Sequence, residues 1–245
     1  MASTRPIAFN LRAWGAWSAE DPPGDPDSPG GRDAHPAPAL LRRRVGVLGQ
    51  HALRLAWGMA CSGEARLIAS SRHGEFRRSL GILDAIIADA DVSPAEFTLS
   101  VHHALVGLLS IARGNCRAHT AIAAGPESFC FGFMEAVACL AENPAEPVLL
   151  IHYDEPLPEP FDRFDSAPGP ALALVMALAA NAGPGEAMTL MATPTAAPGP
   201  MSSPSPAAGF RAFLDDPGAP RFTAVGPRMT WQWSRHVAAA HAAAR

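Results

Sequence analysis

The stretch that decides the fold is HTAIAAGPESFCFGF, residues 119–133. A short apolar run leads into a turn of small residues and then into helical spacing, which predicts a strand over 118–124 and a helix over 127–142. Corners of this kind often present a nucleophile. Here the corner reads Ile-Ala-Ala-Gly over 122–125, and none of these side chains is nucleophilic. The absence of an attacking group at this corner is the main functional question that the sequence raises.

Strand and helix patterns alternate around this corner. Further strands are predicted over 5–17, 65–71, 146–155, 171–180, 187–193 and 229–236, and further helices over 40–60, 72–90 and 210–216. The segment 93–115 is predicted to start extended and to become helical from about residue 100. The alternation favours an α/β fold with a mostly parallel sheet that is flanked by helices on both sides, in which strands 171–180 and 187–193 are antiparallel neighbours.

The 72–90 helix has a clear apolar face. Leu80, Leu83, Ile86 and Ile87 lie on one side of it at three-to-four spacing. The Pro/Gly-rich stretches near 19–39 and 191–209 are interpreted as loops inserted into one domain that spans 1–245, because neither flank has enough core residues to fold alone.

Composition excludes several classes of function. The chain has 245 residues, 48% of them apolar, and a net charge of -4, so it can bury a sizeable core and has no basic excess for nucleic acid. All 19 basic residues are arginine, which excludes Schiff-base or phosphate-loop lysine chemistry. No signal peptide is evident, and the longest apolar region, 171–183, is too short to span a bilayer. We therefore expect a cytoplasmic protein without membrane association.

A metal site is not predicted. His102, His103, Cys116 and His119 are the nearest approach to a ligand cluster, but adjacent residues on a helix point about 100° apart, so one of the paired histidines faces away. The four cysteines have no CxxC spacing. We expect neither a metal nor another cofactor.

Three further sets of reactive side chains have ordinary structural interpretations. Cys130 lies inside the predicted helix, where cysteine usually behaves as a small buried hydrophobe. Asp154 and Glu155 end a strand before a proline-rich segment, which favours a capping or solvated role. Ser128 lacks the flanking glycines of a serine-hydrolase elbow.

The order of the motifs resembles the N-terminal half of a β-ketoacyl synthase, which has a thiolase-like layered fold. The likeness is carried by SVHHALVGLLSIARGN (100–115), HTAIAAGPESFCFGFMEAVACLAE (119–142), PVLLIHYDE (147–155) and SSRHGE (70–75). In that family the short strand ends at a nucleophilic cysteine. In this chain the resemblance places that position at Ile122 or at Ala124, and neither forms a thioester.

Other parts of the family's catalytic set are also missing. The resemblance calls for two histidines and a lysine in the C-terminal half, whereas this chain has no lysine and only His236 and His241 after residue 155. The resemblance therefore implies a non-catalytic subunit rather than an enzyme. Short, cysteine-less relatives of this kind are the chain-length factors of type II polyketide systems, including aryl-polyene biosynthesis.

The resemblance also implies partners and sites. It predicts a heterodimer with a catalytic ketosynthase subunit, visited transiently by an acyl carrier protein, in polyketide, polyene or fatty-acid-like chain elongation. The implied dimer-interface residues are His119, Thr120, Ala121, Ile122, Phe129 and Phe133. The implied tunnel or gate residues, which would set the depth of the partner's acyl pocket, are Phe76, Phe97, Leu99, His102 and His103.

Two alternatives remain open at this stage. One is an enzyme on a divergent thiolase scaffold that uses Cys130 as its nucleophile. The other is a homodimeric binding or scaffold protein that uses the same strand edge without any synthase.

Overall fold

The computed structural model describes residues 5–22, 36–165, 168–180, 185–196, 199 and 205–236. The strands are β1 (Ile7–Ser18), β2 (Arg66–Ser70), β3 (His119–Ile122), β4 (Val148–Asp154), β5 (Leu172–Ala179), β6 (Glu186–Pro194), β7 (Arg221–Val225) and β8 (Met229–Arg235). The helices are α1 (Ala39–Arg42), α2 (Val47–Gly58), α3 (Phe76–Ile87), α4 (Pro94–Thr98), α5 (Ala104–Arg113), α6 (Ser128–Glu142) and α7 (Pro206–Asp215), with 3-10 turns η1 (Ala60–Gly63) and η2 (Asp162–Phe164). Much of the loops predicted near 19–39 and 191–209, and all of 237–245 with His241, lie outside the described residues.

The described strands form one mixed sheet in the order β3-β2-β4-β5-β1-β6-β8-β7. The predicted mixed sheet flanked by helices is confirmed, but the prediction that it is mostly parallel is wrong. Only β2 pairs in parallel, with β3 and with β4, and the other pairings among the described strands are antiparallel. A parallel neighbour needs a crossover that covers one face of the sheet. Helices α3 to α5 form such a connection from β2 to β3, and α6 forms one from β3 to β4.

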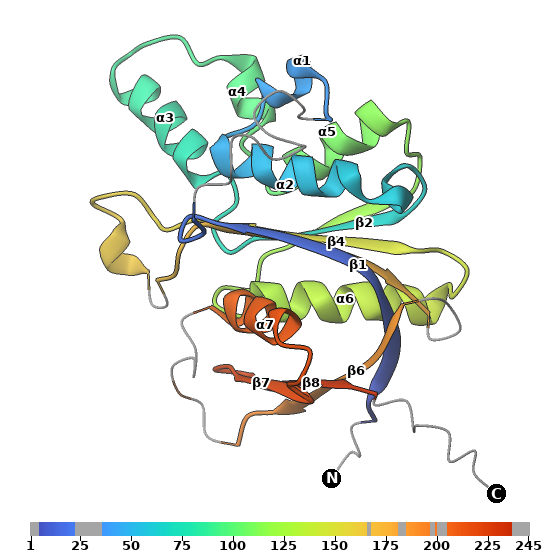
Figure 1. The fold of residues 1–245 in the computed structure, drawn as a ribbon. Helices are drawn as coiled ribbons and strands as arrows, with labels where there is room; N and C mark the ends of the chain where they lie inside the picture. The colour runs from blue at the N-terminus through green and yellow to red at the C-terminus, as the bar shows by residue number, and fades with distance from the viewer. Residues whose placement is uncertain are drawn as a thin grey trace, which may run out of the picture.

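The strands predicted over 171–180 and 187–193 exist but are not neighbours. β1 lies between β5 and β6 and pairs antiparallel with both. Its register shifts between Leu11 and Ala13, where the pairing with β5 is irregular. Such a bulge bends a strand, and β1 bends strongly as it passes from β5 to β6 (Figure 1).

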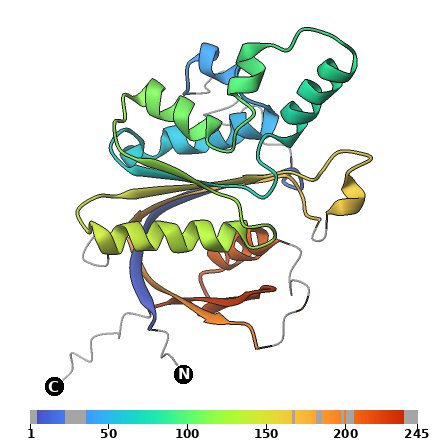
Figure 2. The same cartoon turned by 180° about the vertical axis from the view of Figure 1, so that it is seen from behind.

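The bend produces layers of helix and sheet. Helices α1 to α5 lie on one side of the strands β2, β4 and β1, while α6 and α7 lie on the other (Figure 1). The strands β6, β8 and β7 then run beneath α6 and α7, so that these two helices are enclosed between two parts of one sheet (Figure 2). Two hydrophobic cores result, one on each side of the central strands.

Helix α6 is apolar around most of its circumference, which fits its position between two layers. Phe129, Phe133 and Val137 are all at most 2% exposed. The ring of Phe133 meets Phe9 at 5.2 Å and Trp233 at 5.6 Å, which places it between β1 and β8. Complete burial of a phenylalanine side chain contributes about 1.5–3 kcal/mol.

The segment 94–98 is helical, although an extended start was predicted for 93–99. Ser93 caps α4 by accepting a hydrogen bond from the backbone N–H of Glu96, at 3.4 Å, and Pro94 occupies the first turn. Ser-Pro-Ala-Glu has the spacing of a capping box, which starts a helix at this point. None of the described helices is long and apolar enough to cross a membrane.

Candidate functional site

The corner between β3 and α6 is closed by Ser128. Its Oγ accepts a hydrogen bond from the backbone N–H of Ala124, at 2.9 Å, and donates to the carbonyl oxygen of Gly125, at 2.7 Å. Gly125 has φ of +61°, a left-handed conformation that glycine adopts without steric cost. Ile122 and Ala124, the two candidate positions for a nucleophile, are half-buried. The corner therefore offers no nucleophile, and the amide of Ala124 is already hydrogen-bonded within the chain.

A buried carboxylate, that of Glu127, also stabilises this corner. Glu127 is fully buried, and its Oε2 accepts hydrogen bonds from the backbone N–H of Arg228, at 3.2 Å, and from Arg228 Nε, at 2.9 Å. Its Oε1 accepts from Met229 N, at 3.1 Å, and from Trp231 Nε1, at 3.0 Å. The buried charge is thus satisfied by four donors, as a buried carboxylate requires.

Arg228 also reaches the corner itself. Its Nη2 donates to the carbonyl oxygen of Ala124, at 2.7 Å, and its guanidinium lies over the ring of Phe131 at 4.7 Å. The turn between β7 and β8 therefore holds the backbone that would carry a nucleophile. Sequence reasoning did not identify Glu127 or Arg228, because 101 positions separate them. The only local indication of a role for Glu127 is its position immediately before the first residue of α6, Ser128.

A small cavity of about 40 Å³ opens beside the corner. Its lining includes Arg72, Ser128, His152, Asp154 and Asp165, which come from the ends of β2, β4 and α6 and from the segment after η2. The volume holds a few water molecules but no acyl chain. No cysteine lines this cavity.

The polar groups around the cavity are bonded to one another. His152 is 4% exposed, and its Nδ1 lies 3.0 Å from Ser70 Oγ. Burial lowers the pKa of His152, because the charged imidazolium is poorly solvated there. Asp154 Oδ1 accepts hydrogen bonds from Ser71 Oγ and from two backbone N–H groups, those of Arg72 and His73, each at 3.2 Å. The predicted capping role of Asp154 is confirmed. Glu155 forms an ion pair with Arg77 at 3.3 Å.

Cys130 is fully buried, as its position in a helix predicted. Burial raises the pKa of its thiol well above the ordinary value, and the nearby carboxylate of Glu127 adds to this. A nucleophilic thiol needs the opposite environment, one that favours the thiolate. Cys139, also buried, lies near Arg66, whose Nη1 is 3.4 Å from its sulfur, yet desolvation still raises its pKa.

The candidate tunnel and gate residues lie on one side of the sheet but not in one cavity. Phe76 packs edge-on against Phe161, at 5.5 Å between ring centroids, and Leu99 packs against the core around α2 and α5. Phe97 is 67% exposed. His102 lies beneath Gly74, where an added Cβ would be 2.8 Å from its Nε2.

The edge strand β3 carries four of the six interface candidates. His119 is exposed, and Thr120, Ala121 and Ile122 are half-buried. Among the described strands β3 pairs only with β2, so its other side is open. The ring of His119 lies 6.0 Å from that of His103, a gate candidate, so the structure brings these two groups of residues together at one end of β3.

Phe129 and Phe133 are incorrect as interface candidates. They are 2% and 0% exposed and form an aromatic cluster with Phe210 and Trp233 inside the chain. The reason is that β6, β8 and β7 cover the side of α6 that the sequence alone left without a neighbour. A partner cannot reach these two rings without unfolding that layer.

Comparison with known proteins agrees with this architecture. The model of the N-terminal domain of β-ketoacyl synthases matches residues 14–234. No curated protein matches the sequence.

Several solved structures are similar, and three of them illustrate the range. A structure of the ketosynthase ApeO in complex with its chain length factor ApeC, from Xenorhabdus doucetiae, matches with a TM-score of 0.73 and 22% identity, covering 94% of this chain and 100% of that chain. The ishigamide ketosynthase/chain length factor has a TM-score of 0.53 and 12% identity, covering 63% and 50% of the respective chains. A β-ketoacyl synthase from Burkholderia phymatum STM815 has a TM-score of 0.51 and 14% identity, covering 68% and 52%. At these identities the likeness establishes a shared fold, spanning the whole of the first matched chain and about half of the other two.

Proposed function

Because this chain belongs to the β-ketoacyl synthase family, we propose that it is a non-catalytic ketosynthase-like subunit, a chain-length factor, that pairs with an active β-ketoacyl synthase and shapes its acyl tunnel. We treat residues 1–245 as one ketosynthase-like domain acting in the cytoplasm. The reaction it assists is chain elongation of the type II polyketide kind, as in aryl-polyene biosynthesis. An acyl carrier protein delivers the growing chain transiently.

The observation that carries the proposal is the closed corner between β3 and α6. Covalent catalysis at such a corner needs a nucleophile and free backbone donors for the developing oxyanion. Ile122 and Ala124 supply no nucleophile, and the N–H of Ala124 is hydrogen-bonded to Ser128 Oγ at 2.9 Å. Ser128, Glu127 and Arg228 together hold the corner in this closed form.

The small size of the cavity that the described residues form beside the corner favours the same proposal. The cavity there is only about 40 Å³, whereas a bound acyl chain needs several hundred. The chain is also similar, over 94% of its length, to one from a ketosynthase–chain length factor complex. Both observations favour a subunit that acts on a partner's pocket.

In this proposal the edge strand β3 forms the centre of the interface with the ketosynthase. Leu67 N donates to the carbonyl of Ala118 and Ser71 N donates to that of Ile122, so residues 118 and 122 direct their carbonyls toward β2. In a parallel ladder the alternate residues, His119 and Ala121, direct their backbone groups outward. These groups are available to a strand of the ketosynthase.

The gate residues have a defined role in the complex. In the proposed complex the side of the sheet that carries Phe76, Phe97, Leu99, His102 and His103 faces the partner's acyl tunnel. The exposed members, Phe97 and His103, limit the number of carbons that the tunnel admits. Each methylene that a bulky side chain excludes forfeits about 0.8 kcal/mol of burial. Phe97 supports this role best, because the described residues leave 67% of this phenylalanine exposed.

Co-expression with each β-ketoacyl synthase of the source organism tests the proposal. We expect a stable heterodimer in size-exclusion chromatography with light scattering, and intact-mass spectra that show acyl adducts only on the ketosynthase after incubation with acylated carrier protein. An acyl adduct on this chain would disprove the non-catalytic assignment. A homodimer that excludes every ketosynthase would favour the scaffold alternative instead.

The proposed role of Phe97 in the acyl tunnel is tested separately, by the chain length of the products. Phe97→Ala in the reconstituted complex should shift the products to longer chains, while Phe164→Ala, at a residue that is 63% exposed, should leave them unchanged. If Phe97→Ala leaves the distribution of product chain lengths unchanged, Phe97 does not line the tunnel.

A further inference from the structure

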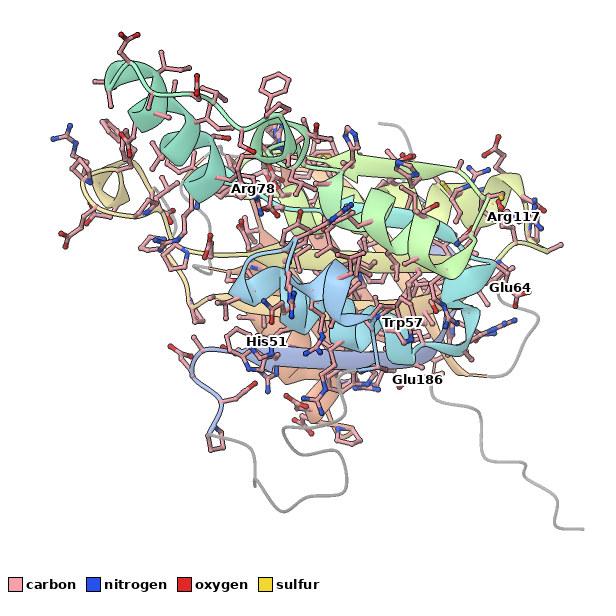
Figure 3. The ribbon with its side chains drawn as sticks, turned by 90° about the horizontal axis from the view of Figure 1, so that it is seen from above. His51, Trp57, Glu64, Arg78, Arg117 and Glu186 are labelled. Carbon is pink, nitrogen blue, oxygen red and sulfur yellow. The ribbon has the colours of Figure 1, made fainter. Side chains whose placement is uncertain are left out.

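Helix α3 is amphipathic, yet none of its residues is buried. Leu83, Ile86 and Ile87 are 53%, 58% and 83% exposed, and Phe97 on the adjacent α4 is 67% exposed. The helix stands away from the sheet and has α4 as its main neighbour (Figures 1 and 3). Apolar residues at this spacing usually face a core. The α3–α4 arm, defined as residues 75–98, therefore presents an apolar surface that the rest of the described chain does not cover.

Polar contacts hold the arm in place. Arg78, labelled in Figure 3, forms ion pairs with Glu96 on α4 and with Glu75, and its Nη2 donates to the carbonyl oxygen of Arg44 at 3.0 Å. Arg77 pairs with Glu155 at 3.3 Å. Because charged groups anchor the base of the arm, its apolar side chains are left free for another contact.

The charge of the arm narrows the class of partner. It carries five carboxylates and two guanidinium groups, a formal charge of -3. Amphipathic helices that bind membranes usually carry basic residues, since cytoplasmic membrane surfaces are anionic. A membrane is therefore a poor match, and a second copy of the arm would meet like charge. The complementary partner is a different protein with an apolar ridge and a basic rim.

The arm is connected to the open edge of the sheet. After α4 the chain passes through Val101, which is 39% exposed, to His103, whose ring lies 6.0 Å from that of His119 at the start of β3. A segment of partly exposed residues, with Val101 and His103 exposed, thus joins the arm to β3. A single partner chain that pairs with β3 is placed to reach the arm as well.

We infer that the α3–α4 arm is a second part of the surface that binds the ketosynthase, and that it selects a heterotypic partner over a second copy of this chain. This inference rests on the proposed function. A hollow of about 330 Å³ between the two helices, lined in part by Gly81, Ile82, Ala85 and Val92, receives a side chain of the ketosynthase. Arg77, Arg78, Asp91 and Glu96 also line the hollow. Glu96 is paired with Arg78, so Asp91 is the carboxylate of this lining that faces the basic rim of the partner.

The chain offers a matched pair of variants for the test. Ile87, on the arm, and Ile111, on α5, are the same residue type and are 83% and 81% exposed. Each is changed to Asp, and binding to the co-purifying ketosynthase is measured by isothermal titration calorimetry. We expect Ile87→Asp to raise the Kd about tenfold or more and Ile111→Asp to leave it unchanged. Both variants should unfold at the wild-type temperature, because neither side chain is buried.

The outcomes separate the two proposals. If wild type binds the ketosynthase but Ile87→Asp binds equally well, the arm is not part of the interface and only this inference fails. Equal losses in both variants would also overturn it, since they would reflect a general effect of added charge. If wild type binds no ketosynthase, the proposed function fails and the inference fails with it. Binding by Asp84→Arg as tight as wild type at low ionic strength would contradict the charge argument.

Discussion

The carboxylate of Glu127 lies 2.9 Å from Nε of Arg228, so the first turn of α6 is joined to the turn between β7 and β8. Arg228 also donates to the carbonyl of Ala124, and Ser128 holds the amide of the same residue. Three side chains therefore fix the backbone at Ala124, one of the two positions at which the family resemblance predicts the nucleophile.

Removal of this carboxylate should destabilise the fold strongly. Glu127→Ala leaves the buried Trp231 Nε1 and the N–H of Met229 without their acceptor. Loss of one partner from a buried charged network costs about 3–5 kcal/mol, and urea unfolding should show a decrease of that order. Glu142→Ala is the control, because that carboxylate is 70% exposed and pairs with Arg66 at the surface. Equal losses for the two variants would contradict the role given to Glu127.

Cys130 should be chemically inert in the folded chain. Burial raises the pKa of its thiol, so the thiolate is scarce near neutral pH. Iodoacetamide should label the exposed Cys116 quickly and Cys130 only after unfolding, as peptide mass mapping would show. Cys130→Ala should cost about 1–2 kcal/mol of packing and leave turnover of the reconstituted complex unchanged. Loss of turnover without loss of stability would instead support the enzyme alternative.

The edge of β3 should be sensitive to the loss of one outward N–H. Ala121→Pro removes a donor that points away from β2, so we expect the monomer to stay folded and heterodimer formation to be lost. Ala121→Ser keeps the N–H and serves as the control. The measurement is the elution volume of each variant mixed with the ketosynthase. If Ala121→Pro associates with the ketosynthase as well as the wild type does, the dimer interface does not include the edge of β3.

His152 should make the stability of the fold depend on pH. Burial lowers its pKa below the value of 6.5 that it has when unfolded, so the unfolded chain takes up a proton before the folded chain does. Its contribution is present above that value and is lost as the pH falls, with a slope of at most about 1.4 kcal/mol per pH unit. His152→Gln should flatten the decrease in unfolding free energy between about pH 7 and pH 5, as urea unfolding at a series of pH values would show. An unchanged slope in His152→Gln would assign the pH dependence to other groups.

Much of the fold was predictable because local pattern and local structure agree. The strand over 118–124 and the helix over 127–142 appear as His119–Ile122 and Ser128–Glu142. The extended start predicted for 93–99 is wrong, because Ser93 caps a helix that begins at Pro94. The parallel sheet was overpredicted because strand direction depends on the path of each connection, which periodicity does not encode.

The site was less predictable than the fold. The missing nucleophile could be read directly, since it concerns the identity of residues 122–125. The positions of Phe129 and Phe133 could not, because α6 is apolar on two sides and sequence does not say which side meets a partner. The apolar residues of α3 show the opposite error. Their spacing is typical of a helix that packs on a core, yet the structure leaves them exposed.

The sequence by itself determined that this chain alternates strands and helices, carries no lysine and has no nucleophile at its strand-to-helix corner. These are properties of residue identity and short-range spacing. The tertiary structure alone decided that β6, β8 and β7 cover α6, that Arg228 reaches Glu127, and that β3 and the α3–α4 arm remain open. These are contacts between segments far apart in the chain. They depend on how the bent β1 carries the sheet around α6, which short-range pattern cannot specify.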